Sequence, residues 1–151
     1  MKYYIASSYD SNIKIKNIEK VENRLAEQFV KYYSPRNYFV PNTQQDNGEW
    51  GRCEFEKTLN ALKECDGIVC LYYGHESDST TSFILGFAYA MGMPTIVINM
   101  YNNVESSYAV INAATVSIDG IASIKNYDFI KLPPCKSSNI QKLVCKNQSE
   151  K

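Results

Sequence analysis

The stretch from Gly67 to Met100 constrains the fold of this chain more than any other segment. Its two ends, Gly67–Tyr72 and Thr95–Met100, are apolar runs typical of buried strands. The segment between them carries apolar side chains at the three- and four-residue spacing of a buried helix face: Phe83, Phe87, Ala90 and Met91. Gly92 and Pro94 are expected to end this helix. The pattern predicts a strand–helix–strand (βαβ) unit.

The rest of the chain repeats this alternation of strands and helices. Further strands are predicted over three segments: Lys2–Ser7, Asn37–Val40 and Thr115–Ile118. Further helices are predicted over three others: Asn17–Tyr33, Trp50–Cys65 and Glu105–Ala114. The first helix is predicted from apolar residues at helical spacing: Ile18, Val21, Leu25, Phe29 and Val30. The alternation predicts an α/β fold in which helices cover both faces of a parallel, doubly wound sheet.

Composition sets the expected compartment and partners. The chain has 151 residues and a formal net charge of zero, so neither nucleic acid nor a membrane surface is an expected partner. The five cysteines lack C-x-x-C spacing and are expected to be free thiols in a reducing compartment: Cys53, Cys65, Cys70, Cys135 and Cys145. With no apolar run suited to a signal peptide or a membrane span, we predict a cytoplasmic protein.

Small hydroxyl residues gather where the central helix begins. Ser79, Thr80 and Thr81 follow the Gly67–Tyr72 strand, and open α/β sheets bind their ligands at the carboxyl ends of strands. Free backbone N–H groups at a helix start favour an anion, so these hydroxyls are predicted to bind a ligand and to be able to hold a phosphate. The alternative is ordinary capping by Ser79 or Thr80, with the other hydroxyls solvated.

The same helix carries a resemblance to a known family. Asp78–Pro94 resembles the signature of the nucleoside 2-deoxyribosyltransferases, which reads close to Asp-Ser-Gly-Thr-Ala-Phe-Glu-Leu-Gly-Tyr-Ala-Tyr-Ala-Leu-Gly-Lys-Pro. Ile124–Phe129 resembles the closing Leu-x-x-Tyr-Asp-Phe of the family. The resemblance implies a flavodoxin-like, five-stranded parallel sheet over residues 1–130. Residues 131–151 are then expected to be a polar tail that is disordered or docks on a partner subunit.

The residue that performs the family's chemistry is replaced in this chain. The signature glutamate is the nucleophile that attacks the sugar's anomeric carbon, and Ile84 stands at its position. Because isoleucine cannot attack or ionise, the resemblance implies no catalytic residue by the family's route. The single histidine, His75, and the lack of a dinucleotide-binding glycine fingerprint predict no metal and no cofactor. Ile84 either forms an apolar wall of the old pocket or joins the core and leaves no pocket. Glu76, on the preceding loop, is the carboxylate that we expect could substitute by activating water, and Glu49 and Asp10 are further loop carboxylates.

The resemblance also implies roles for residues outside the helix. Asp78 matches the aspartate that contacts the nucleoside, although it could be only a helix-entry aspartate. Ser7 and Tyr9 lie where the family walls the base pocket, and Tyr9 is either a stacking residue or a surface tyrosine. Thr58 stands in place of an aspartate that holds the base. Asn112 matches an asparagine that reaches the sugar of a neighbouring subunit, which implies a homodimer or larger homo-oligomer.

The predicted function is therefore that of a transferase-like protein without catalysis. It is expected to bind or sequester a nucleoside- or nucleotide-type small molecule, such as a nucleotide second messenger, without cleaving it. Two alternatives stay open. One is an active N-deoxyribosyltransferase or nucleotide N-glycoside hydrolase that uses a relocated carboxylate, and the other is a scaffold that uses the fold only for assembly.

Overall fold

The computed structural model describes residues 1–39, 48–101 and 108–133. Its five strands are all parallel and lie in the order β2-β1-β3-β4-β5. Their bounds are β1 Lys2–Ala6, β2 Lys31–Tyr33, β3 Gly67–Tyr72, β4 Thr95–Asn99 and β5 Val116–Asp119. The predicted five-stranded parallel sheet is confirmed. The strand order reverses between β1 and β3, which is where doubly wound sheets open a crevice for ligands.

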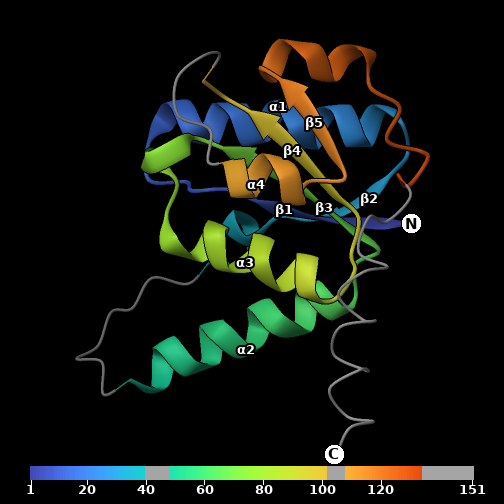
Figure 1. The fold of residues 1–151 in the computed structure, drawn as a ribbon. Helices are drawn as coiled ribbons and strands as arrows, with labels where there is room; N and C mark the ends of the chain where they lie inside the picture. Colours follow the sequence, from blue (N-terminus) through green and yellow to red (C-terminus); the bar gives the residue numbers. More distant parts are fainter. Residues whose placement is uncertain (40–47, 102–107, 134–151) are drawn as a thin grey trace, which may run out of the picture.

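Helices cover both faces of this sheet (Figure 1). Four are α-helices: α1 Asn12–Glu27, α2 Glu49–Lys63, α3 Ser79–Ala90 and α4 Tyr108–Ala113. Three are short 3₁₀ helices: η1 Pro35–Asn37, η2 Gly74–Glu76 and η3 Ile121–Asn126. Side chains of α1 and η3 pack on one face, and side chains of α2, α3 and α4 pack on the other. The doubly wound arrangement is therefore confirmed.

Two hydrophobic cores hold the layers together. Tyr3 and Phe129 are fully buried in the α1 side of the sheet, with their rings edge to face at 6.2 Å. The core on the other face packs Leu62 of α2 and Ala88 of α3 against the sheet. Gly67 begins β3 at a point where a Cβ would lie 3.0 Å from side chains and 3.1 Å from a backbone oxygen. Only glycine fits there without displacing its neighbours.

The prediction for the segment after α1 was wrong. The expected helix to Tyr33 ends at Glu27, and the strand expected at Asn37–Val40 is instead β2, at Lys31–Tyr33. The helix is stopped by Phe29, whose φ of 57° is left-handed and whose side chain is 96% exposed. The Phe29 and Val30 N–H groups bond back to carbonyls of the last helical turn, at 3.0 and 2.9 Å. A left-handed residue that ends a helix is usually a glycine. Because a phenylalanine stands here, the apolar spacing predicted a helix that continued past this position.

The predicted buried face of α3 was also wrong. Phe83 is 45% exposed, and Ala90 and Met91 are exposed as well. The buried residues of α3 are instead Thr81, Ile84, Leu85 and Ala88. Because α3 is apolar on several sides, spacing alone could not decide which side meets the sheet. The Phe83 ring turns toward α2, where its centroid lies 5.6 Å from that of Phe55.

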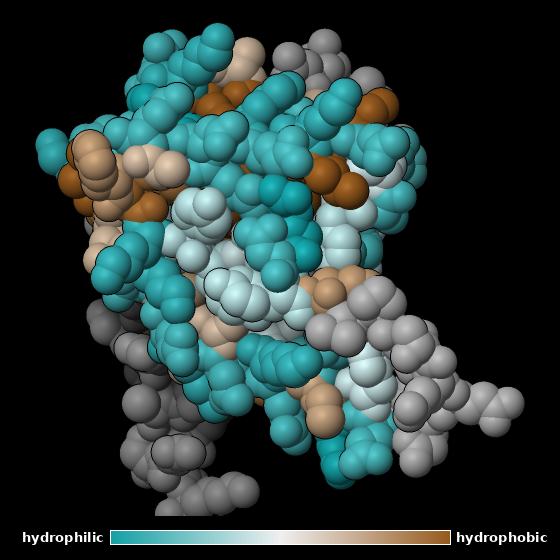
Figure 2. All heavy atoms as spheres, turned by 180° about the vertical axis from the view of Figure 1, so that it is seen from behind, coloured by the Kyte–Doolittle hydropathy of each residue, from teal (hydrophilic) through white to brown (hydrophobic). Residues whose placement is uncertain are grey.

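Several predictions fall on residues that the structure does not describe: Val40, Glu105, Cys135, Cys145 and the tail from residue 134. None of the described helices is long and apolar enough to cross a membrane. From behind, the described surface is mostly hydrophilic, and its hydrophobic residues form small separate groups (Figure 2). On this face, the described residues therefore present no broad apolar surface.

Candidate functional site

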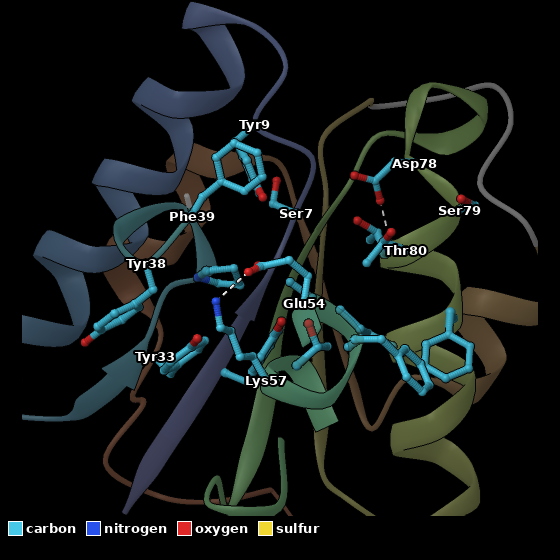
Figure 3. Close-up of a pocket in the computed structure, with 18 of the residues that line it drawn as sticks. Ser7, Tyr9, Tyr33, Tyr38, Phe39, Glu54, Lys57, Asp78, Ser79 and Thr80 are labelled. Atoms are coloured by element: carbon cyan, nitrogen blue, oxygen red, sulfur yellow. Dashed lines mark hydrogen bonds and ion pairs between the residues drawn. The ribbon is translucent and has the colours of Figure 1, made fainter. Parts of the chain in front are cut away.

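A cavity of about 830 Å³ opens between the carboxyl ends of β1 and β2 and the entrance of α3 (Figure 3). Its lining includes the ends of β1 and β2, the segment around η1, the first turns of α2 and the entrance of α3. The cavity therefore lies at the point where the strand order reverses, the usual ligand site of such a sheet.

Most of the sequence-predicted ligand residues lie around this one cavity. The structure brings together eight of them: Ser7, Tyr9, Thr58, Asp78, Ser79, Thr80, Thr81 and Ile84. Asn112 is exposed on α4 and does not line the cavity. Glu76 does not line it either; its carboxylate accepts a hydrogen bond from the Tyr101 hydroxyl at 2.5 Å. The structure thus does not place Asn112 or Glu76 with the other residues.

The entrance of α3 is capped by Asp78. The Asp78 Oδ1 atom accepts a hydrogen bond from the Thr81 N–H at 2.6 Å. The Asp78 N–H donates in turn to the Ser8 hydroxyl at 3.1 Å, which ties this helix entrance to the end of β1. The alternative of capping by Ser79 or Thr80 is therefore wrong. Both of these hydroxyl residues are exposed beside the cavity.

Ile84 combines the two interpretations that the sequence allowed. Its side chain is only 3% exposed and belongs to the core that contains Tyr4, Ala6 and Leu85. It also lines the cavity, which has not closed around it. At the floor of the site, an apolar side chain thus occupies the position where the family signature carries a carboxylate.

Aromatic side chains form much of the cavity wall. Tyr33 stacks on Tyr38 with ring centroids 4.8 Å apart and an angle of 5°, and on Tyr4 at 5.5 Å and 24°. Phe39 lies edge to face with two rings, 5.8 Å from Tyr9 and 6.1 Å from the tryptophan Trp50. Sequence reasoning named only Tyr9 among these residues. The abundance of tyrosine was the available signal, but it did not say which tyrosines would meet.

The cavity also contains charged groups, two of which, Glu54 and Lys57, sequence reasoning missed. Glu54 and Lys57 lie three residues apart on α2 and form an ion pair at 2.6 Å. Asp10, after β1, also lines the cavity and pairs with Lys14 at 3.0 Å. A helical spacing of three predicts that Glu54 and Lys57 can pair, but not that their side of α2 faces a cavity.

The pKa values of two tyrosines that line the cavity, Tyr4 and Tyr9, are raised above the ordinary value of tyrosine. Burial raises the pKa of Tyr9, and the Asp78 and Glu54 carboxylates raise it further. Burial also raises the pKa of Tyr4, against the opposing effect of a side-chain hydrogen bond with Thr58. Both hydroxyls therefore stay protonated at neutral pH, and each can donate one hydrogen bond.

An ion pair positions the wall around η1. Arg36 donates from Nε and Nη2 to the two carboxylate oxygens of Glu22 on α1, at 3.0 and 2.5 Å. Burial by itself would raise the pKa of Glu22, but the hydrogen bonds and the charge of Arg36, together with the Ser34 and Asn37 side chains, outweigh it and hold that pKa below its ordinary value. Pro35, Tyr38 and Phe39 flank this arginine and line the cavity, so the pair fixes the wall that carries them.

The described residues hold no group of three or more metal-ligating side chains arranged for a metal ion. Cys65 and Cys70 are buried free thiols, whereas Cys53 is free and exposed. Burial raises the pKa of Cys65 to about 11, which leaves that thiol unreactive at neutral pH.

The chain belongs to the nucleoside 2-deoxyribosyltransferase family, whose sequence profile matches residues 3–123. Its fold is similar to that of a 2-deoxyribosyltransferase from Bacillus psychrosaccharolyticus, with a TM-score of 0.76 and 23% identity over 89% of this chain and 98% of that one. It is also similar to a CMP N-glycosidase from Clostridium botulinum, with a TM-score of 0.59 and 17% identity over 83% and 97% of the two chains.

A third similar structure is a conserved protein from Enterococcus faecalis V583, with a TM-score of 0.58 and 17% identity over 97% of this chain and 98% of that one. A search of curated protein sequences finds no match to the chain. At these identities, the structural likeness shows the fold. The family match independently supports a role related to that of the nucleoside transferases.

Proposed function

We propose that this protein binds a nucleoside- or nucleotide-type small molecule in the cavity and does not cleave it. The observation that carries the proposal is Ile84, which lies at the signature's nucleophile position and lines the cavity as a buried apolar side chain. A retaining glycosyl transfer needs a carboxylate held within attack distance of the anomeric carbon. An isoleucine at the cavity floor supplies only a hydrophobic contact.

The other carboxylates of the cavity are already engaged. Asp78 caps α3, Asp10 pairs with Lys14, and Glu54 pairs with Lys57. Each interaction favours the present orientation of its carboxylate over one in which it would attack a sugar. This supports binding in place of covalent chemistry.

The ligand class follows from the family and from the cavity wall. Two of the similar structures are named as a 2-deoxyribosyltransferase for the synthesis of nucleosides and as a CMP N-glycosidase, and both nucleosides and CMP contain a flat base. The stacked tyrosines and Trp50 offer flat faces to such a ring, and aromatic stacking contributes about 1–3 kcal/mol per base.

The test is an incubation of the protein with a panel of nucleosides and nucleotides, followed by chromatography for free base. Binding is measured on the same panel by isothermal titration calorimetry and by the fluorescence of Trp50, the chain's single tryptophan, which lines the cavity. We expect at least one ligand to bind and no ligand to lose its base. Base release by the protein would contradict the proposal, provided that a carboxylate variant abolishes it.

One observation favours the alternative that the protein is an enzyme that cleaves an N-glycosidic bond with a relocated carboxylate. Glu54 lines the cavity, so it is better placed than Glu76 to activate a water molecule. If the protein hydrolyses an N-glycosidic bond, Glu54→Gln should abolish hydrolysis and Glu76→Gln should not. Loss of hydrolysis in Glu76→Gln alone would instead support the loop carboxylate that the sequence suggested.

We also propose that the protein works as a homo-oligomer and that residues 1–130 form its functional domain. Asn112 is exposed on α4, so it could reach a cavity only in a neighbouring copy. Sedimentation with and without ligand tests this. We expect a dimer or larger assembly, and a monomer that binds ligand at full strength would contradict it.

A further inference from the structure

We propose that the cavity selects a positively charged heteroaromatic ring, such as an N-alkylated base or a pyridinium, carried free or on an unphosphorylated sugar. This inference rests on the proposed function and names the ligand class of the same site. It is argued from the charges around the cavity, from the entrance of α3 and from the aromatic wall.

The described lining of the cavity is predominantly anionic. Its three carboxylates, Asp10, Glu54 and Asp78, outnumber its one described cation, Lys57. Asp10 pairs with Lys14 at 3.0 Å and Glu54 pairs with Lys57 at 2.6 Å, so neither lysine offers an unpaired charge to a phosphate. An anionic ligand would thus meet a lining with an excess of one negative charge, that of Asp78.

The position that would normally attract a phosphate is already taken. A helix start attracts anions through its free N–H groups, and α3 begins directly at the cavity. Asp78 supplies the anion there, with its Oδ1 atom 2.6 Å from the Thr81 nitrogen. A phosphate at Ser79 and Thr80 would have to displace this carboxylate or lie beside it. The hydroxyl cluster therefore suits the hydroxyls of a sugar better than a phosphate.

The aromatic wall suits a cationic ring. Figure 3 shows Tyr9, Tyr33, Tyr38 and Phe39 on one side of the cavity and Asp78 on the opposite side, with Glu54 between them. A flat ring placed between these sides would contact electron-rich aromatic groups and keep its charge near two carboxylates. Aromatic faces attract cations through their quadrupole. Carboxylates offset the loss of hydration that a cation suffers when it enters a cavity.

Among the described residues that line the cavity, Lys57 is the one lysine or arginine. The pKa of Tyr9 agrees with this balance, since Asp78 and Glu54 add to the effect of burial in raising it. Charge selection is thus a property of the cavity lining as a whole.

The experiment compares matched probes by isothermal titration calorimetry, at slightly acidic pH where 7-methylguanosine carries a positive charge. Comparing the affinities of guanosine and 7-methylguanosine measures the effect of a positive charge on the ring. Comparing the affinities of nicotinamide riboside and its 5′-monophosphate measures the effect of the phosphate. We expect the cationic member to bind about tenfold more tightly than guanosine, and the riboside about tenfold more tightly than the monophosphate. Quenching of Trp50 fluorescence should accompany binding at this site.

Asp78→Asn is the informative variant, because asparagine can still cap α3 without the charge. It should reduce the preference for the riboside over the monophosphate by about three- to tenfold. Glu64→Gln is the matched control, because its carboxylate pairs with Lys2 outside the cavity lining and should leave both ratios unchanged.

Equal binding of guanosine and 7-methylguanosine, or tighter binding of the monophosphate than of the riboside, would overturn this inference and leave the proposed function intact. Absence of binding by all four probes and by the wider nucleoside panel would overturn both.

Discussion

Replacing Arg36 by methionine removes the ion pair that holds the η1 wall of the cavity. The variant keeps most of the aliphatic volume of the side chain but leaves the Glu22 carboxylate, 8% exposed, without its two hydrogen-bond donors. Removing one partner from a fully buried ion pair costs about 3–5 kcal/mol. Because the Arg36 side chain is itself 22% exposed, we expect a loss of about 2–3 kcal/mol in the free energy of unfolding.

In a chain of this length, such a loss corresponds to a decrease of roughly 4–12 °C in the melting temperature. Urea unfolding followed by far-UV circular dichroism gives the free energy, and Trp50 fluorescence reports on the cavity in the folded state. Glu64→Gln is the control, since it breaks an exposed 3.0 Å pair with Lys2 and should cost less than about 1 kcal/mol. Ligand affinity should fall only in the Arg36 variant, because its wall carries Tyr38 and Phe39.

The stability difference between wild type and Arg36→Met should also depend on pH, in a direction that follows from the pKa of Glu22. The pKa of Glu22 is lower in the folded protein than its ordinary value of 4.5, so the stabilisation from this pair is fully present above that ordinary value. The stabilisation is lost as the pH falls through the folded-state pKa, so the difference between wild type and Arg36→Met should shrink in acid. If Arg36→Met costs no more than Glu64→Gln at neutral pH, or if the difference grows in acid, the reasoning about this pair is refuted.

Three further substitutions test the fold by thermal or urea unfolding. Gly67→Ala should destabilise by about 1–3 kcal/mol, since its Cβ would meet neighbours at 3.0–3.1 Å, and an unchanged stability would contradict the close packing at β3. Phe29→Gly should stabilise by up to about 1 kcal/mol by relieving a left-handed φ at an exposed site, and a loss of stability would show that the ring contributes. Tyr3→Phe should leave stability unchanged or raise it by about 1 kcal/mol, because the buried Tyr3 hydroxyl has no hydrogen-bond partner among the described residues. A clear loss of stability in this variant would mean that the hydroxyl does have a partner.

The sequence contained enough information for most of the sheet and for the neighbourhood of the cavity. Apolar runs identified β3 at Gly67–Tyr72 and β4 to within one residue, because buried parallel strands are continuously hydrophobic. The signature from Asp78 to Pro94 placed the site at the entrance of α3, since ligands bind at strand ends in such folds. These features are local in the chain, so a single sequence reveals them.

What the sequence could not show depends on contacts between distant segments. The wrong assignment of β2 arose because Phe29 adopts a left-handed conformation that an apolar pattern does not signal. Glu54 and Lys57 were overlooked because their role follows from where α2 lies against the strand ends. The row formed by Tyr4, Tyr33 and Tyr38 likewise joins residues from β1, β2 and the end of η1. Such groupings become visible only once the layers are assembled.

The most direct test of the central claim is a proton NMR spectrum of one nucleoside that binds, recorded over a day with the protein present. The signal of the anomeric proton reports both events at once, because binding shifts or broadens it and cleavage removes it. The account predicts a shifted or broadened signal with constant intensity and no signal from free base. A signal that declines while free base accumulates, at a rate proportional to protein concentration, would contradict it.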